Sequence, residues 1–191
     1  PEDDIRDTNP PTNPELLAAL EEHFISSGFD LKSLIREITR SSAYQLSSKP
    51  NNYNLVDRQN YSRYYPKRMQ AEVLLDSIDF LTGAKTTFAN LPPGTRAVAL
   101  PDNSYNRASP LLQVFGRPNS LSVCECERVQ SSSLAQSLHL INSSEIKSKL
   151  AYASGRAARL AKEETPDEEK VAELYLAAFA RKPRPGEMAT A

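Results

Sequence analysis

Residues 109–142 read SPLLQVFGRPNSLSVCECERVQSSSLAQSLHLIN and combine two helix-forming patterns with an irregular connection. Ser109 can cap a short helix that carries Pro110 in its first turn and ends near Gly116. Ser132 or Ser133 can start another helix. The segment therefore predicts two short helices with an irregular stretch between them, and this stretch holds both cysteines of the chain.

The flanking sequence repeats the helical spacing. Asn13 can cap a helix that starts at Pro14 and stops at Gly28, and Asp30 can cap a second helix, joined to the first as a hairpin. Apolar residues three and four positions apart extend both helices. We expect further helices at about 67–81, from Ser143 to about 162 and at about 166–180, and residues 184–191 resemble the first turn of one more.

Two stretches show no sustained period. Residues 47–65 are polar and rich in tyrosine, and residues 86–106 are rich in Pro, Asn and Gly, with one strand-like piece at 96–100. The chain has 191 residues, which suits one domain, 1–191. The sequence predicts a mainly α fold, an irregular multi-helix domain of about six helices with long ordered loops and at most one short strand or hairpin. It starts without Met, and we expect truncation at both ends.

Composition excludes several classes of protein. The chain has 23 basic and 24 acidic residues, a formal charge of -1, which argues against a surface dedicated to nucleic acid. No run approaches the roughly 18 apolar residues of a spanning helix, so no membrane insertion is expected. Phosphate loops, nucleophile elbows and zinc-protease motifs are also missing from the sequence.

Cys124 and Cys126 flank Glu125 and would point to the same face of an extended segment. This geometry fits a metal pair, completed by His139, Glu127 or Glu125, or a tight disulfide, or two unpaired core cysteines. The metal reading, with Cys124, Cys126 and His139 as ligands, is the less favoured, because Cys-x-Cys lacks the usual two-residue spacer and there is no second cysteine pair. The neighbouring glutamates would raise the pKa of the thiols, which argues against a nucleophile.

Two arginines, Arg117 and Arg128, bracket the cysteines. They can jointly bind an anionic group or a carboxylate, or Arg128 can form an internal ion pair with Glu127, Glu72 or Asp76, and the internal pair is favoured. Arg68, Glu72 and Asp76 are secondary candidates, since the helix expected at about 67–81 aligns them at i, i+4 and i+8.

A further polar row completes the candidate cluster. Gln136, His139 and Asn142 recur every three residues, which places them along one face of a helix. Such side chains can form a site beside Arg128, but more often they tie down neighbouring loop backbone. The candidate functional cluster is therefore Arg117, Cys124, Cys126, Glu127, Arg128, Gln136, His139 and Asn142.

The sequence also resembles a known family. FGRP at 115–118, CECER at 124–128 and QSLHLIN at 136–142 are similar to the planctomycete PSD-one domain, a domain of unknown function at the C-terminus of large multidomain proteins. NPPTNPELLAALEEHFISSGFDLKSLIREITRSSAYQLSS at 9–48, RMQAE at 68–72, GTRAVALPDN at 94–103 and LYLAAFARKPRPGE at 174–187 continue the resemblance in order along the chain.

This resemblance implies an exported parent protein, periplasmic or at the cell surface, with a signal and often a cytochrome c-like domain upstream. Haem then belongs to that separate domain, since this chain has no Cys-x-x-Cys-His motif and no cofactor is expected in it. Export also favours a disulfide over free thiols at the cysteine pair.

The expected function is a non-catalytic scaffolding or interaction module that packs against the upstream domains of its own parent. Its contact surface would lie at residues 86–106 and 117–128. The alternative is an extracellular hydrolase or a metal-dependent redox accessory with its site at CECER. Any small-molecule or polysaccharide ligand remains open.

Overall fold

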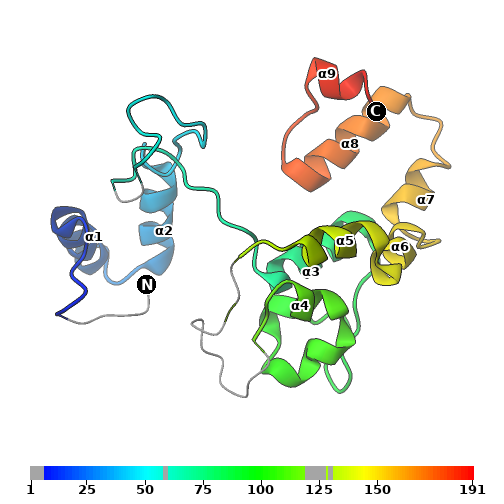
Figure 1. Cartoon of the computed structure of the whole chain (residues 1–191), viewed down its shortest axis with the longest axis horizontal. Helices are drawn as coiled ribbons and strands as arrows, with labels where there is room; N and C mark the ends of the chain where they lie inside the picture. The colour runs from blue at the N-terminus through cyan, green and yellow to red at the C-terminus, as the bar shows by residue number, and fades with distance from the viewer. Residues whose placement is uncertain (1–6, 58–59, 119–127, 129–130) are drawn as a thin grey trace. The chain divides into compact units, whose positions relative to one another are not determined.

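The computed structural model describes residues 7–57, 60–118, 128 and 131–191. The chain divides into two compact units, Pro1–Lys67 and Arg68–Ala191 (Figure 1). Over the described ranges all regular structure is helical and no strand is present, and six of the helices there have seven residues or more. The mainly α prediction is confirmed.

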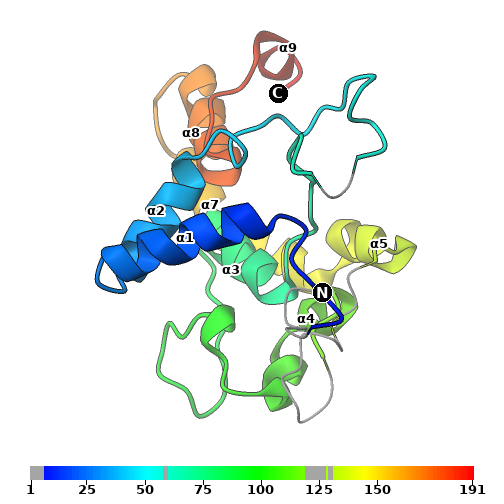
Figure 2. The same ribbon diagram turned by 90° about the vertical axis from the view of Figure 1, so that its left-hand side faces the viewer.

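The first unit is built on a helical hairpin of α1, Pro14–Ser26, and α2, Leu31–Arg40, which pack against each other (Figure 2). Asn13 accepts a hydrogen bond from the amide of Leu16, and Asp30 accepts from two amides of the first turn of α2. These caps satisfy N–H groups that a helix start leaves free. Both predicted N-caps are thus confirmed.

In the second unit a central helix, α3 (Ala71–Thr82), organises the fold (Figure 1). It contacts the 3₁₀ helix η1 (Ala97–Ala99), α4 (Pro110–Val114), α6 (Ser144–Leu150), α7 (Arg156–Leu160) and α8 (Asp167–Phe179). The 3₁₀ helix η2 (Asn103–Ala108) and α5 (Leu134–Asn142) pack on α4. The core beside α3 consists of Ala71, Leu75, Phe88, Ala97, Leu111, Leu112, Phe115 and Ile146.

Two expectations about the segments after α3 were wrong. Residues 97–99 form the 3₁₀ turn η1 and not a strand, because the Asp76 carboxylate accepts hydrogen bonds from the amides of Ala97 and Val98 at 2.7 and 3.3 Å. The predicted helix from Ser143 to about 162 is divided into α6 and α7. The division falls at a turn that ends at Gly155, which lies directly against the end of α3.

The C-terminal helix α9, Pro185–Met188, is tied back to the segment that follows α8. The Arg181 guanidinium donates to both oxygens of Glu187 at 2.8 Å and lies 5.5 Å from the ring centre of Tyr175. The hydrogen bonds from Arg181 lower the pKa of Glu187 to about 2. Within the sequence block FARKPRPGE, this pair therefore holds Glu187 against Arg181.

Candidate functional site

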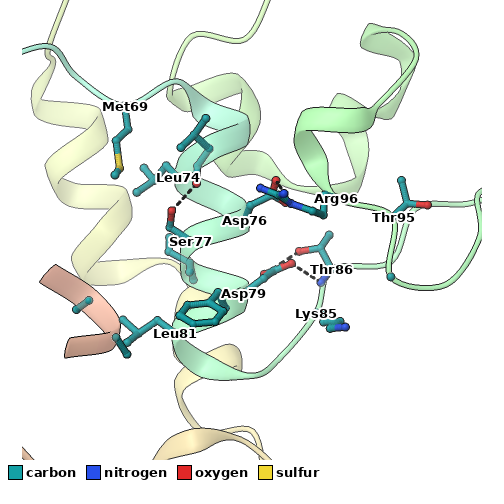
Figure 3. Close-up of a pocket in the computed structure, with 16 residues that line it drawn as sticks. Met69, Leu74, Asp76, Ser77, Asp79, Leu81, Lys85, Thr86, Thr95 and Arg96 are labelled. Atoms are coloured by element: carbon teal, nitrogen blue, oxygen red, sulfur yellow. Dashed lines mark hydrogen bonds and ion pairs between the residues drawn. The ribbon is translucent and has the colours of Figure 1, made fainter. Parts of the chain in front are cut away.

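Three carboxylates along α3 bind the irregular segments of the second unit. Glu72, Asp76 and Asp79 each accept hydrogen bonds from residues far away in the sequence. Figure 3 shows the side chains of Asp76 and Asp79 leaving α3 toward the loop that carries Thr86 and Arg96. Because loop amides and buried cations need acceptors, these three residues hold the loops on the helix.

Glu72 pairs with both arginines of the candidate cluster. Arg117 Nε donates to Glu72 Oε1 at 2.9 Å, and Arg128 donates to both carboxylate oxygens at 2.8 and 3.1 Å. The side chains are 5 % exposed for Arg117, 8 % for Arg128 and 10 % for Glu72. The predicted internal ion pair between Arg128 and the third helix is therefore present, with Glu72 as its acceptor.

The remaining donors of Arg117 also meet protein oxygens. Nη1 donates to Asn106 Oδ1 at 2.7 Å, and Nη2 donates to the Asp102 carbonyl at 3.1 Å. Asn106 in turn donates to the Pro118 carbonyl at 2.9 Å. Gly116, with a φ of 82°, gives the left-handed turn that places Arg117 directly after α4. Arg117 thus joins η2, the end of α4 and α3.

Burial of Glu72 would by itself raise its pKa, but the net pKa lies below the usual 4.5. Hydrogen bonds and positive charge from Arg128, a backbone hydrogen bond and the hydrogen bond from Arg117 lower it. A carboxylate held between two guanidinium groups is stable as the anion. Glu72 therefore serves as a counter-ion here, and as a poor proton donor near neutral pH.

The predicted row of Arg68, Glu72 and Asp76 along one helix was wrong, because α3 begins at Ala71 and Arg68 lies before it. Arg68 precedes α3 and donates to the carbonyls of Phe115 and Ser131 at 3.1 and 3.3 Å. Asp76 caps η1 and also lies 3.4 Å from Arg96 Nε. Arg68 thus binds two segments to the residues before α3, and Asp76 binds η1 to α3 itself.

Only some residues of the polar row on α5 contact neighbouring segments. Gln136 forms a capping box with Ser133 and also donates to the Val114 carbonyl at 3.1 Å. The His139 ring packs edge-on against Phe115, with ring centres 6.5 Å apart, and its Nε2 is buried without a hydrogen-bond partner among the described residues. Asn142 is exposed. Gln136 thus has the predicted backbone-tying role.

Cys124, Cys126 and Glu127 lie outside the described residues. The metal, disulfide and core-cysteine alternatives therefore stay predictions. Within the described part of the chain, no cluster of three or more His, Cys, Asp or Glu side chains is arranged to hold a metal ion.

One buried cluster was not predicted. Lys149 on α6 is 9 % exposed, and its Nζ donates to Asp79 Oδ1 at 2.5 Å, to Thr86 Oγ1 at 2.8 Å and to the Ala84 carbonyl at 3.0 Å. Thr86 also donates its amide to Asp79 at 2.7 Å. From the sequence, Lys149 cannot be distinguished from its neighbour Lys147, which is exposed. No local signal therefore predicts that Lys149 is buried.

A groove of about 770 Å³ runs beside α3 within the second unit (Figure 3). We call it the α3–α8 groove. α3 forms its floor, α8 contributes two alanines, and the loop 85–96 forms the opposite wall. Its apolar lining consists of Met69, Val73, Leu74, Ile78, Phe80, Leu81, Ala177 and Ala178. Phe80 is 65 % exposed and Met69 is 52 % exposed, so large apolar side chains face the open space.

The charges around the groove do not balance. Asp76 is paired with Arg96, and Asp79 is paired with Lys149. Lys85 also lines the groove, and no carboxylate among the described residues pairs with it. The wall formed by the loop 85–96 therefore carries one cation in excess.

The described residues define an all-helical protein in which Glu72, Arg117 and Gln136 mainly hold segments of the chain together. A family model matches residues 1–191, and the chain belongs to that family, PSD1, described as "Protein of unknown function (DUF1553)". The family resemblance of the sequence is thereby confirmed. No curated protein and no solved structure matches the chain significantly. No helix in the described ranges is both long and apolar enough to cross a membrane.

Proposed function

We propose that this chain is a non-catalytic interaction module of an exported multidomain protein and that the α3–α8 groove binds a segment of the parent's upstream domains. The observation that carries the proposal is the open apolar lining of this groove. Apolar area of this kind is costly to leave in water and is typical of surfaces that a partner covers.

The polar residues support the same function. Arg117 and Arg128 direct their guanidinium groups at Glu72. The side chain of Gln136 takes part in a helix cap and donates to the Val114 carbonyl at the end of α4. Groups engaged in this way position loops and are poorly placed to act on a substrate. The enzymatic alternative therefore depends on the CECE residues, 124–127. The described residues support no particular reaction class for it.

The groove overlaps part of the contact surface expected from the sequence. Thr86, Gly94, Thr95 and Arg96 come from the expected stretch 86–106 and form the loop wall. Lys85 directly precedes this stretch. The floor, in contrast, belongs to α3, whose apolar residues a sequence pattern assigns to the core.

The test uses the upstream domains of the parent protein, produced separately, and titration calorimetry with this chain. Ala178→Glu places a charged side chain in the groove and should weaken binding at least tenfold, because burying an unpaired carboxylate is costly. Ala161→Glu is the matched control, since Ala161 is exposed at the end of α7 and does not line the groove. Equal affinities for the native chain and folded Ala178→Glu would overturn the proposal, as would a lack of any binding.

A further inference from the structure

The shape of the α3–α8 groove restricts what can occupy it. Val73, Ser77 and Leu81 lie one helical turn apart along α3 and line the floor. They span about 12 Å, or about two turns of helix. Ala177 and Ala178 on α8 are small, so a partner backbone can approach closely on that side. A partner segment that follows α3 can therefore contact all three floor residues.

The helical floor of the groove offers little hydrogen bonding to a bound backbone. The amides of α3 are used within the helix, and the described residues contain no strand whose edge an extended segment could join. A segment buried there must satisfy its own N–H and C=O groups, and an α-helix does so. Apolar residues at i, i+3, i+4 and i+7 would then face the floor.

The charges of the groove determine which residues can flank the apolar stripe of that helix. The carboxylates of Asp76 and Asp79 are occupied by Arg96, Lys149 and loop amides. Lys85 on the loop wall is exposed and has no ion-pair partner among the described residues. An acidic side chain on the bound helix would complement this cation, whereas a basic one would add to the excess.

We infer that the α3–α8 groove accepts an amphipathic helix of a partner polypeptide whose apolar stripe is flanked by an Asp or Glu that pairs with Lys85. The inference rests on the proposed function and specifies the chemistry of the ligand.

The experiment is a selection from a displayed library of helical peptides of about 16 residues, long enough to hold helical structure. Stripe positions vary among Leu, Ala, Val, Phe and Met, and flanking positions vary among Glu, Gln and Lys. The full chain is the target in three forms: native, Lys85→Glu and Ala178→Glu. Circular dichroism verifies that each variant is folded, and Lys85→Gln is used for affinity measurements on selected peptides.

We expect acidic flanks to be enriched on the native chain and basic flanks on Lys85→Glu. Lys85→Gln should bind an acidic peptide about two- to fivefold more weakly, as for an exposed ion pair. Peptides that bind the native chain but not Ala178→Glu, with no preference at the flanks, would overturn the pairing with Lys85 and leave the groove as a docking surface. Selected peptides that bind Ala178→Glu equally well, or no selected peptides, would overturn the helix-binding groove itself.

Discussion

Arg117 Nε lies 2.9 Å from Glu72 Oε1, and this contact joins residues 45 positions apart. Glu72 lies in the first turn of α3, and Arg117 follows α4. Since Arg128 binds the same carboxylate from a third segment, one anion connects three parts of the second unit. Removal of that anion would leave two guanidinium groups facing each other in a nearly closed site.

Glu72→Gln should lower the free energy of unfolding by about 3 kcal/mol, because breaking a buried pair leaves uncompensated charge. Hydrogen exchange of the α3 amides measures this unit separately from the helical hairpin. Glu168→Gln, on the exposed first turn of α8, is the control and should change stability by less than about 0.5 kcal/mol. A loss below about 1 kcal/mol in Glu72→Gln would contradict this account.

The same carboxylate predicts a pH dependence. The pKa of Glu72 is lower in the folded chain than its usual 4.5, so its contribution to stability is complete above that value and is lost as the pH falls through the folded pKa. Urea unfolding of the native chain and of Glu72→Gln should therefore give stabilities that converge below about pH 4.5. A constant difference between about pH 7 and pH 3 would show that Glu72 does not titrate in this way.

Lys149→Met retains most of the buried stem but removes an ammonium group with three acceptors. We expect a loss of about 3 kcal/mol, since Asp79 would stay partly buried without its cation. Lys147→Met on the exposed face of α6 serves as the matched variant and should be close to neutral. Thermal unfolding followed by circular dichroism compares them, and equal melting temperatures would refute the role of Lys149.

Gly155→Ala tests the close approach between the turn before α7 and the end of α3. An added Cβ would lie 2.6 Å from the Thr82 carbonyl oxygen and 3.0 Å from that of Tyr152, and both are backbone atoms. We expect destabilisation by about 1–3 kcal/mol. In Gly186→Ala the new methyl would meet nothing within 4 Å, so this change should be neutral or slightly stabilising. The reverse order of stabilities would rule out the packing argument.

Glu187 should titrate far below an ordinary glutamate. Its NMR midpoint is expected at about 2, and Arg181→Gln should move it back toward 4.5 because the principal hydrogen-bond donor is lost. Lys182→Gln, which changes a neighbouring exposed charge, should leave the midpoint nearly unchanged. A midpoint near 4.5 in the native chain would mean that the Arg181 contact does not persist in solution.

Local signals predicted the helices where caps are strong. Asn13 and Asp30 begin α1 and α2 as expected, Gly83 ends α3 in the left-handed conformation, and Ser133 forms a capping box with Gln136. Each signal acts within four residues, so the sequence around it is enough. Prediction was wrong at residues 97–99 and at the turn before Gly155, where contacts with α3 override the local pattern.

The candidate site was predictable only in part. An ion pair between Arg128 and the third helix was expected, and joint binding of a carboxylate by Arg117 and Arg128 was one alternative. The sequence did not show that Glu72 serves both arginines. The pairing of Lys149 with Asp79 spans 70 residues and has no sequence signature. Cys124 and Cys126 lie outside the described residues, so predictions about them stand as they were.

By itself, the sequence determined the helical class, most helix starts and the family, because caps, apolar periodicity and ordered motifs are read along the chain. Only the tertiary structure decided which loop each carboxylate of α3 holds and where apolar side chains stay open beside it. The physical reason is the distance along the sequence over which each interaction acts. A cap acts within one helical turn, whereas a buried ion pair or a groove depends on how distant segments meet.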